Sequence, residues 1–116
     1  MKIRLVLAFA AIALFGLATT AQAQDKALIE KGMKVYDAQK CSMCHSIAGK
    51  GNAKGPLEGV GTKLTEADIR LWMTDPKAAT AKFKPARTSP PMKAFTSLPK
   101  EDMDAVVAYM LSLKKK

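Results

Sequence analysis

Histidine and cysteine are scarce in this chain of 116 residues, which has one histidine and two cysteines. All three lie between Cys41 and His45, so a second pair of metal ligands is missing and a four-ligand zinc site is disfavoured. Strand-like alternation of apolar and polar residues is also missing, and there is no internal repeat. The sequence therefore predicts an all-α fold with long loops.

Long apolar runs are absent except at the N-terminus, where an apolar stretch covers residues 5–18. A basic start precedes this stretch and the small residues "AQA" follow it, which is typical of a secretory signal peptide. The stretch is shorter than the roughly 20 residues that span a bilayer, although a retained anchor is the alternative. We predict that residues 1–23 are removed and that residues 24–116 form a single domain in the periplasm, without stable membrane insertion.

Acidic residues are few, with 10 aspartates and glutamates against 19 lysines and arginines. Removal of Lys2 and Arg4 with the signal peptide leaves 17 basic residues against the same 10 acids, a net charge of +7. A charge of this sign suits an acidic protein, an anionic membrane surface or nucleic acid. Because the chain is exported, we expect no nucleic-acid partner.

Three helices are predicted from local patterns. The first covers residues 26–40, where apolar side chains recur at helical spacing. The second opens at Thr65, where Asp68 completes a capping box, and it stops at Asp75 because a proline follows. The third runs from Pro99 towards the C-terminus, with an apolar stripe of Met103, Val106, Val107, Met110 and Leu111.

Glycine and proline mark the segments between these helices. Residues 46–63 hold five glycines and one proline, and residues 76–99 hold five prolines. Both segments are therefore expected to be mostly irregular, with one helical turn at residues 77–82.

Four interpretations compete for the residues "CSMCH". A thioredoxin-like redox pair needs a neighbouring strand, and none is predicted. A zinc site lacks its second ligand pair, and a disulfide between Cys41 and Cys44 would close almost no loop. The C-x-x-C-H spacing is that of covalent haem attachment, in which both thiols bond the haem vinyl groups and His45 bonds the iron. Export agrees with this interpretation, and we predict one haem c.

Further segments follow the attachment motif in a characteristic order. They are "GKGNAKGPLEGVG", the helix holding "LWMTDP", the segment "SPPMKAF" and the C-terminal "VVAYMLSL". Together with "CSMCH" they make the mature chain resemble a small class I bacterial cytochrome c over essentially its whole length. The resemblance implies the cytochrome c fold, with three main helices and long loops around one covalently attached haem.

The second axial ligand decides the chemistry, because a haem iron with both axial positions filled can only pass electrons. No second histidine exists, so methionine is the candidate. Most methionines are expected elsewhere, in the core for Met33, Met103 and Met110 and within the attachment loop for Met43.

Met92 is the predicted sixth ligand. It follows two prolines in a loop, where class I cytochromes similarly place the ligand methionine. The alternatives are that Met92 only packs on the haem edge without bonding the iron, or that Met73 is the ligand. Lys93 follows Met92, whereas proline is commoner in the family at that position. Ligation by His45 and Met92 predicts a positive midpoint potential, since a thioether favours ferrous iron.

The resemblance also implies contacts around the ring. The Pro56 carbonyl is expected to accept a hydrogen bond from Nδ1 of His45, and Leu57 to pack on the ring face, with a plain turn at "GPL" as the alternative. Trp72 is expected to donate its indole N–H to a haem propionate, or else to be a plain core aromatic. Close packing of the terminal helices is expected at Gly32, Tyr36 and Tyr109.

Basic residues gather between Asp75 and Glu101, where the sequence has no acid. We expect them to surround the exposed haem edge and to attract an acidic redox partner, such as a reductase or an oxidase, although a solvated charged face is the alternative. The six residues are Lys77, Lys82, Lys84, Arg87, Lys93 and Lys100.

Taken together, these patterns predict a monomeric periplasmic carrier of single electrons that is not an enzyme. One alternative is a haem enzyme or sensor with an open sixth position. Another is a haem subunit of a larger complex, such as a sulfur-oxidising system. A thiol–disulfide oxidoreductase is the third alternative, and absence of haem would be its first sign.

Overall fold

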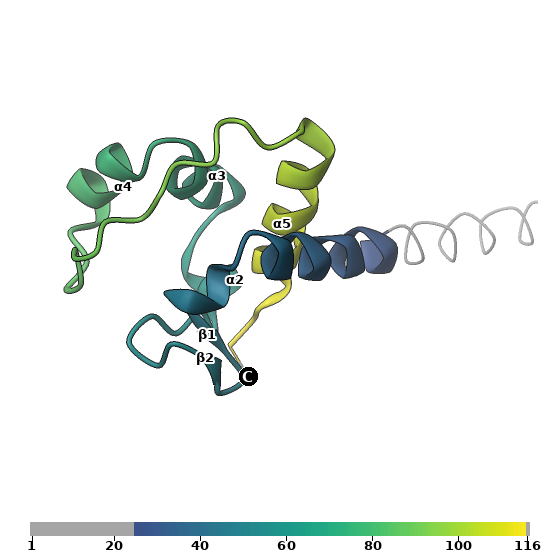
Figure 1. Cartoon of the computed structure of the whole chain (residues 1–116), viewed down its shortest axis with the longest axis horizontal. Helices are drawn as coiled ribbons and strands as arrows, with labels where there is room; N and C mark the ends of the chain where they lie inside the picture. The colour runs from purple at the N-terminus through teal and green to yellow at the C-terminus, as the bar shows by residue number, and fades with distance from the viewer. Residues whose placement is uncertain (1–24, 116) are drawn as a thin grey trace, which may run out of the picture.

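The computed structural model describes residues 25–115, so the predicted signal peptide lies outside the described residues. Residues 25–38 are helical, and in Figure 1 this N-terminal helix crosses α5, with α3 and α4 to one side. None of the helices within residues 25–115 is both long and apolar enough to cross a membrane. The elements that follow the first helix are η1 (Cys41–Met43), β1 (Ser46–Ile47), β2 (Lys50–Gly51), α2 (Val60–Lys63), α3 (Glu66–Thr74), α4 (Pro76–Phe83) and α5 (Lys100–Ser112).

Helix α3 begins and ends where the sequence predicts. The Thr65 hydroxyl accepts a hydrogen bond from the Asp68 amide at 3.2 Å, and the Asp68 carboxylate accepts one from the Thr65 amide at 3.1 Å, which completes the capping box. Asp75 ends the helix, and its carboxylate accepts a hydrogen bond from the amide of Ala78 at 3.0 Å. Asp75 therefore caps the C-terminus of α3 and the N-terminus of α4.

Residues 76–99 are mostly irregular as predicted, but α4 is longer than the single helical turn that was expected at residues 77–82. Its eight residues make two turns where one was expected. The physical reason is that Pro76 occupies the first position of the helix. The backbone N–H of that position makes no hydrogen bond within a helix, so proline loses nothing there, and its fixed φ is already helical. Beyond Lys84 the segment is irregular up to α5, as predicted.

A short hairpin is the second correction, since no strand was predicted. Strands β1 and β2 pair antiparallel through Ser46 with Gly51 and Ile47 with Lys50. The two turn residues, Ala48 and Gly49, have φ of 51° and 78°, as a type I′ hairpin turn requires. With two residues in each strand, no alternating pattern exists for sequence analysis to find.

The hydrophobic core lies between α5, α3 and the N-terminal helix. The predicted burial of Met103 and Met110 is confirmed, whereas that of Met33 is wrong, because its side chain is 47% exposed. The face of the first helix that meets α5 is set by Gly32 and Tyr36, and Met33 lies beside that face. The buried residues of the core cluster are Val35, Tyr36, Ile69, Met73, Met103, Val106, Val107 and Met110.

The predicted packing of the terminal helices is confirmed. The rings of Tyr36 and Tyr109 meet edge to face, with centroids 5.8 Å apart. The Tyr36 hydroxyl is buried without a hydrogen-bond partner among the described residues, and burial raises its pKa to about 12. Tyr36 therefore stays neutral at physiological pH.

We expect Gly32→Ala to lower the free energy of unfolding by about 1–3 kcal/mol, although alanine is the better helix former. A Cβ at Gly32 would collide with the Ala105 carbonyl and with Cβ of Tyr109, so the two helices would have to separate. Chemical denaturation measures the change. Lys34→Ala, an exposed position on the same helix, is the control and should change stability by less than about 0.5 kcal/mol.

Asp104 links α3 to α5 and makes stability depend on pH. Its carboxylate accepts hydrogen bonds from Lys100 at 2.7 Å and from Arg70 at 2.8 Å, and these two cations lower its pKa. Because the folded-state pKa is depressed, the stabilisation is present above the unfolded value of about 3.9 and is lost as pH falls below it.

We therefore expect Asp104→Asn to be less stable than the wild type at pH 7, with a difference that shrinks as the pH falls below about 4. Denaturation midpoints across the acid range measure this difference. Glu30→Gln, at an exposed acid without an ion pair among the described residues, is the matched control. A difference that stays constant with pH would contradict the role given to Asp104.

Candidate functional site

The attachment motif forms one tight turn directly after the first helix. Lys40 adopts a left-handed conformation with φ of 57°, which ends the helical run and starts η1 at Cys41. The Cys41 carbonyl then accepts hydrogen bonds from the amides of Cys44 at 3.1 Å and His45 at 2.9 Å. The two thiols and the imidazole are thus carried by five residues of fixed backbone geometry.

Both cysteines are free thiols, Cys41 partly buried and Cys44 exposed. Cys41 packs against the hydrophobic core, and burial together with the nearby Asp37 raises the pKa of its thiol to about 11. A redox-active cysteine needs the opposite shift, towards a thiolate at neutral pH. At Cys41 the shift is therefore opposite to the one that the thiol–disulfide oxidoreductase alternative requires.

The imidazole of His45 is held by one backbone carbonyl. Its Nδ1 lies 3.1 Å from the Gly55 carbonyl oxygen, which can only accept, so Nδ1 carries the hydrogen and Nε2 has a free lone pair. Burial lowers the pKa of His45, and the charge of Arg87 lowers it further against the opposing effect of the Gly55 bond. The neutral tautomer that a metal requires is therefore favoured.

The carbonyl that holds His45 is a correction, because Pro56 was expected to provide it. Pro56 pairs with Ser46 in an isolated parallel bridge, flanked by the bonds from the Ser46 amide to Gly55 at 3.0 Å and from the Leu57 amide to Ser46 at 2.9 Å. This pairing directs the Gly55 carbonyl towards residues 45 and 46 and leaves Pro56 exposed. Gly55 is required for the approach, since a Cβ there would collide with the Cys44 carbonyl.

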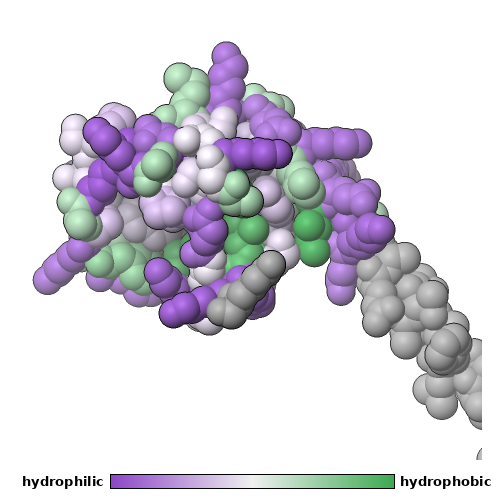
Figure 2. Space-filling view, turned by 90° about the horizontal axis from the view of Figure 1, so that it is seen from below, coloured by the Kyte–Doolittle hydropathy of each residue, from purple (hydrophilic) through white to green (hydrophobic). Residues whose placement is uncertain are grey.

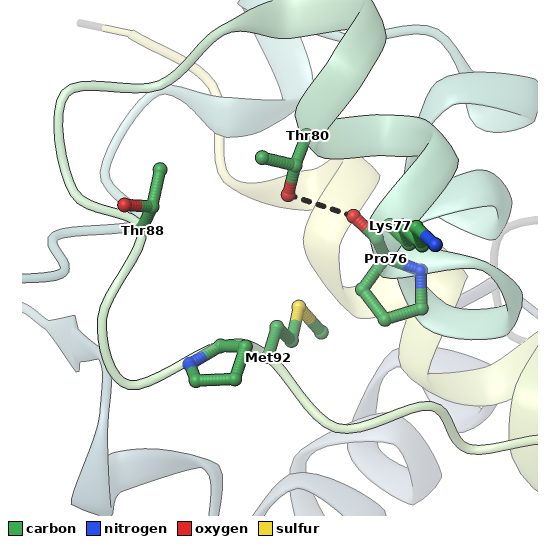
Figure 3. Close-up of a pocket in the computed structure, with 6 residues that line it drawn as sticks. Pro76, Lys77, Thr80, Thr88 and Met92 are labelled. Carbon is green, nitrogen blue, oxygen red and sulfur yellow. Dashed lines mark hydrogen bonds between the residues drawn. The ribbon is translucent and has the colours of Figure 1, made fainter.

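Met92 lies in the loop between α4 and α5, and its side chain packs against the hydrophobic core. Its partly buried side chain extends towards the first turn of α4, beside a pocket of about 340 Å³ (Figure 3). The loop is fixed after Met92 by a hydrogen bond from the Phe95 amide to the Met73 carbonyl at 2.7 Å. The pocket is lined by Pro76, Lys77, Thr80, Thr88, Pro91 and Met92.

Two other predicted site residues have different surroundings. Leu57 is partly buried and packs against the core cluster, as do Cys41 and Met92. Trp72 stacks on Phe83, with ring centroids 6.0 Å apart and an interplanar angle of 20°. Its indole N–H makes no hydrogen bond within the described residues, so the predicted bond to a propionate stays a prediction.

The donor set suits a prosthetic group better than a bare metal ion. No group of three or more histidine, cysteine, aspartate or glutamate side chains able to hold a metal ion occurs among residues 25–115. A porphyrin supplies its own nitrogen ligands and needs from the chain two thiols for attachment and axial donors. The free thiols, the oriented His45 and a methionine beside the same core fit those requirements.

The face of the molecule shown in Figure 2 is mainly hydrophilic, with smaller apolar areas. Among the six basic residues after Asp75, three are engaged: Lys82 with Asp68, Lys100 with Asp104, and Arg87 with the Cys44 carbonyl. Within the described part of the chain, the other three are exposed and make no ion pair; they are Lys77, Lys84 and Lys93.

Sequence reasoning missed two features of the site. The lining of the pocket by Lys77, Thr80 and Thr88 has no sequence signature, because it depends on how α4 faces the loop. Arg87 was assigned only to the basic surface, whereas its guanidinium donates to the Cys44 carbonyl at 3.0 Å. The available signal was that Arg87 is the one charged residue in the stretch "PARTSPPM".

Comparison with known proteins places the chain in a wider context. A family model described as Cytochrome c matches residues 29–114. The chain is 29% identical over 108 residues to cytochrome c oxidase subunit 2 of Alkalihalophilus pseudofirmus, and this match covers 85% of the chain and 30% of that protein. The chain thus spans less than a third of the length of this curated relative. No solved structure gave a significant match.

Proposed function

The chain belongs to the cytochrome c family of haem-binding electron-transfer proteins, and from that premise we propose that it carries single electrons between redox partners in the periplasm. In this proposal, one haem c is attached through Cys41 and Cys44, and its iron is ligated by His45 and Met92. The bound haem supplies a one-electron couple between ferric and ferrous iron.

The observation that carries the proposal is the state of His45. Its Nδ1–H is donated to the Gly55 carbonyl at 3.1 Å, which fixes the ring and would leave Nε2 available to bind the haem iron. The two free thiols precede it in the same tight turn. A hydrogen-bonded imidazole of this kind is also more basic as a ligand, so the chain orients and strengthens its proximal donor.

Elimination among the methionines supports Met92 as the second axial donor. Met73, Met103 and Met110 are buried in the hydrophobic core, and Met33 and Met43 are exposed on the surface. Met92 alone among these described methionines is partly buried in a loop beside a pocket. With both axial positions filled, the protein transfers electrons and does not act on a bound substrate.

Charge supports an acidic redox partner. The exposed cations Lys77, Lys84 and Lys93 lie on α4 and on the loop that carries Met92, so they present positive charge beside the proposed electron-transfer site. Such charges speed the encounter with an acidic partner, and the association weakens as the salt concentration rises because salt screens the attraction. The signal-peptide pattern in residues 1–23 supports a periplasmic location.

The test is an optical spectrum of the protein matured with c-type haem attachment, recorded oxidised and then reduced. The carrier proposal expects sharp c-type bands on reduction, a weak long-wavelength band from iron–sulfur bonding when oxidised, and no rapid uptake of carbon monoxide. A missing iron–sulfur band with immediate carbon monoxide binding would favour an enzyme or sensor with an open sixth position.

A second candidate is a haem subunit of a larger periplasmic oxidoreductase complex. The observation in its favour is that the curated relative is by name a subunit of an oxidase and is more than three times longer than the matched region. Size-exclusion chromatography of the native protein separates the two proposals. A free carrier elutes as a monomer, whereas a subunit elutes with its complex.

A further inference from the structure

We propose that Arg87 is a positioning residue that holds the Met92 loop against the attachment segment and thereby stabilises iron–sulfur bonding; this inference rests on the proposed function. Its guanidinium Nη1 donates a hydrogen bond to the Cys44 carbonyl at 3.0 Å, across 43 residues of sequence. Arg87 thus connects the segment that carries the proximal ligand to the loop that carries the distal one.

The loop has few other attachments. From residue 85 to residue 94, no backbone hydrogen bond is formed with any part of residues 25–115. The Arg87 side chain makes the one side-chain hydrogen bond of this stretch within the described chain, and the Phe95 amide makes the next backbone bond, to Met73 at 2.7 Å. Met92 therefore lies between two anchors, five residues after one and three residues before the other.

The anchor lies at the point where His45 is fixed. A Cβ placed on Gly55 would be 3.2 Å from Nη1 of Arg87 and 3.1 Å from Nδ1 of His45, so the three residues meet in one small volume. The Arg87 side chain is also partly buried at this contact. Loss of Arg87 would therefore release the loop on the side that faces the proximal ligand.

The experiment is a titration of the ferric holoprotein with imidazole, which competes with Met92 for the iron. A hydrogen bond from a charged donor contributes enough free energy to change an equilibrium about tenfold. We expect Arg87→Gln to bind imidazole about tenfold more tightly than the wild type. Lys84→Gln is the matched control, because it removes a positive charge from an exposed side chain three residues earlier, and it should leave the affinity unchanged.

Denaturant unfolding of the same proteins separates positioning from general stability, since a merely structural Arg87 would lower the unfolding midpoint without changing imidazole affinity under native conditions. Unchanged affinity in Arg87→Gln, or the same increase in Lys84→Gln, overturns the inference. If Arg87→Gln does not accumulate, Arg87→Met keeps a long side chain without the donor and takes its place. If the wild type itself lacks the iron–sulfur band, Met92 is not the ligand. That result refutes the proposed function, and it differs from the results that refute the role of Arg87 alone.

Discussion

Replacing Met92 with alanine is expected to lower the midpoint potential by on the order of 0.2 V, because axial ligands set haem potentials over about 0.8 V and a thioether favours ferrous iron. The weak long-wavelength band of the oxidised protein should vanish. The reduced variant should bind carbon monoxide at once, since the vacated position is open. A spectrophotometric redox titration and a carbon monoxide difference spectrum measure these changes.

Two buried methionines give the matched controls for Met92→Ala. Met73 and Met110 are 6% and 7% exposed, and replacement by leucine conserves their volume at a cost below about 1.5 kcal/mol. Both variants should keep the band and the potential of the wild type. Loss of the band in Met73→Leu together with its survival in Met92→Ala would reassign the ligand to Met73, which was the alternative from the sequence.

Replacing both Cys41 and Cys44 with serine is expected to abolish covalent haem. Serine has no thiol to add to a vinyl group, and the chain has no other cysteine that could take over the attachment. The folded protein should also accumulate less, because a group that binds the folded state stabilises it. The measurement is the haem that stays with the polypeptide after acid–solvent extraction and on a denaturing gel.

The two residues between the cysteines provide the controls for this pair of substitutions. Ser42 and Met43 are both exposed, Met43 by 69%, so replacing either with alanine should leave the amount of covalent haem unchanged. Each single cysteine variant should keep one thioether bond. Covalent haem in the double variant would contradict the attachment site that the C-x-x-C-H motif predicts.

Local patterns predicted the parts of the fold that short-range interactions determine. The capping box of Thr65 and Asp68 was recognisable because both of its hydrogen bonds join residues three apart. The apolar stripe of α5 was equally recognisable, because residues at helical spacing lie on one face of the helix, and that face packs on the core. Gly32 was identified from the family resemblance, and the collision that a Cβ would cause there supplies its physical reason.

Features that depend on long-range geometry were less accessible. The carbonyl that holds His45 belongs to Gly55 because of a bridge between residues 46 and 56, and no local pattern distinguishes it from the carbonyl of Pro56. Met33 was predicted to be buried because it lies at helical spacing from other apolar residues. It is exposed because the first helix meets α5 through Gly32, and Met33 lies beside that contact. The contact of Arg87 with Cys44 joins two loops, whose mutual approach the sequence does not encode locally.

The junction at Asp75, where one residue ends α3 and caps α4, restricts how the chain length can evolve. One inserted residue would turn α4 by about 100° relative to α3 and would separate the cap from the amide of Ala78. Homologues of different length are therefore expected to keep this junction intact. The same reasoning advises against grafting a peptide at Asp75.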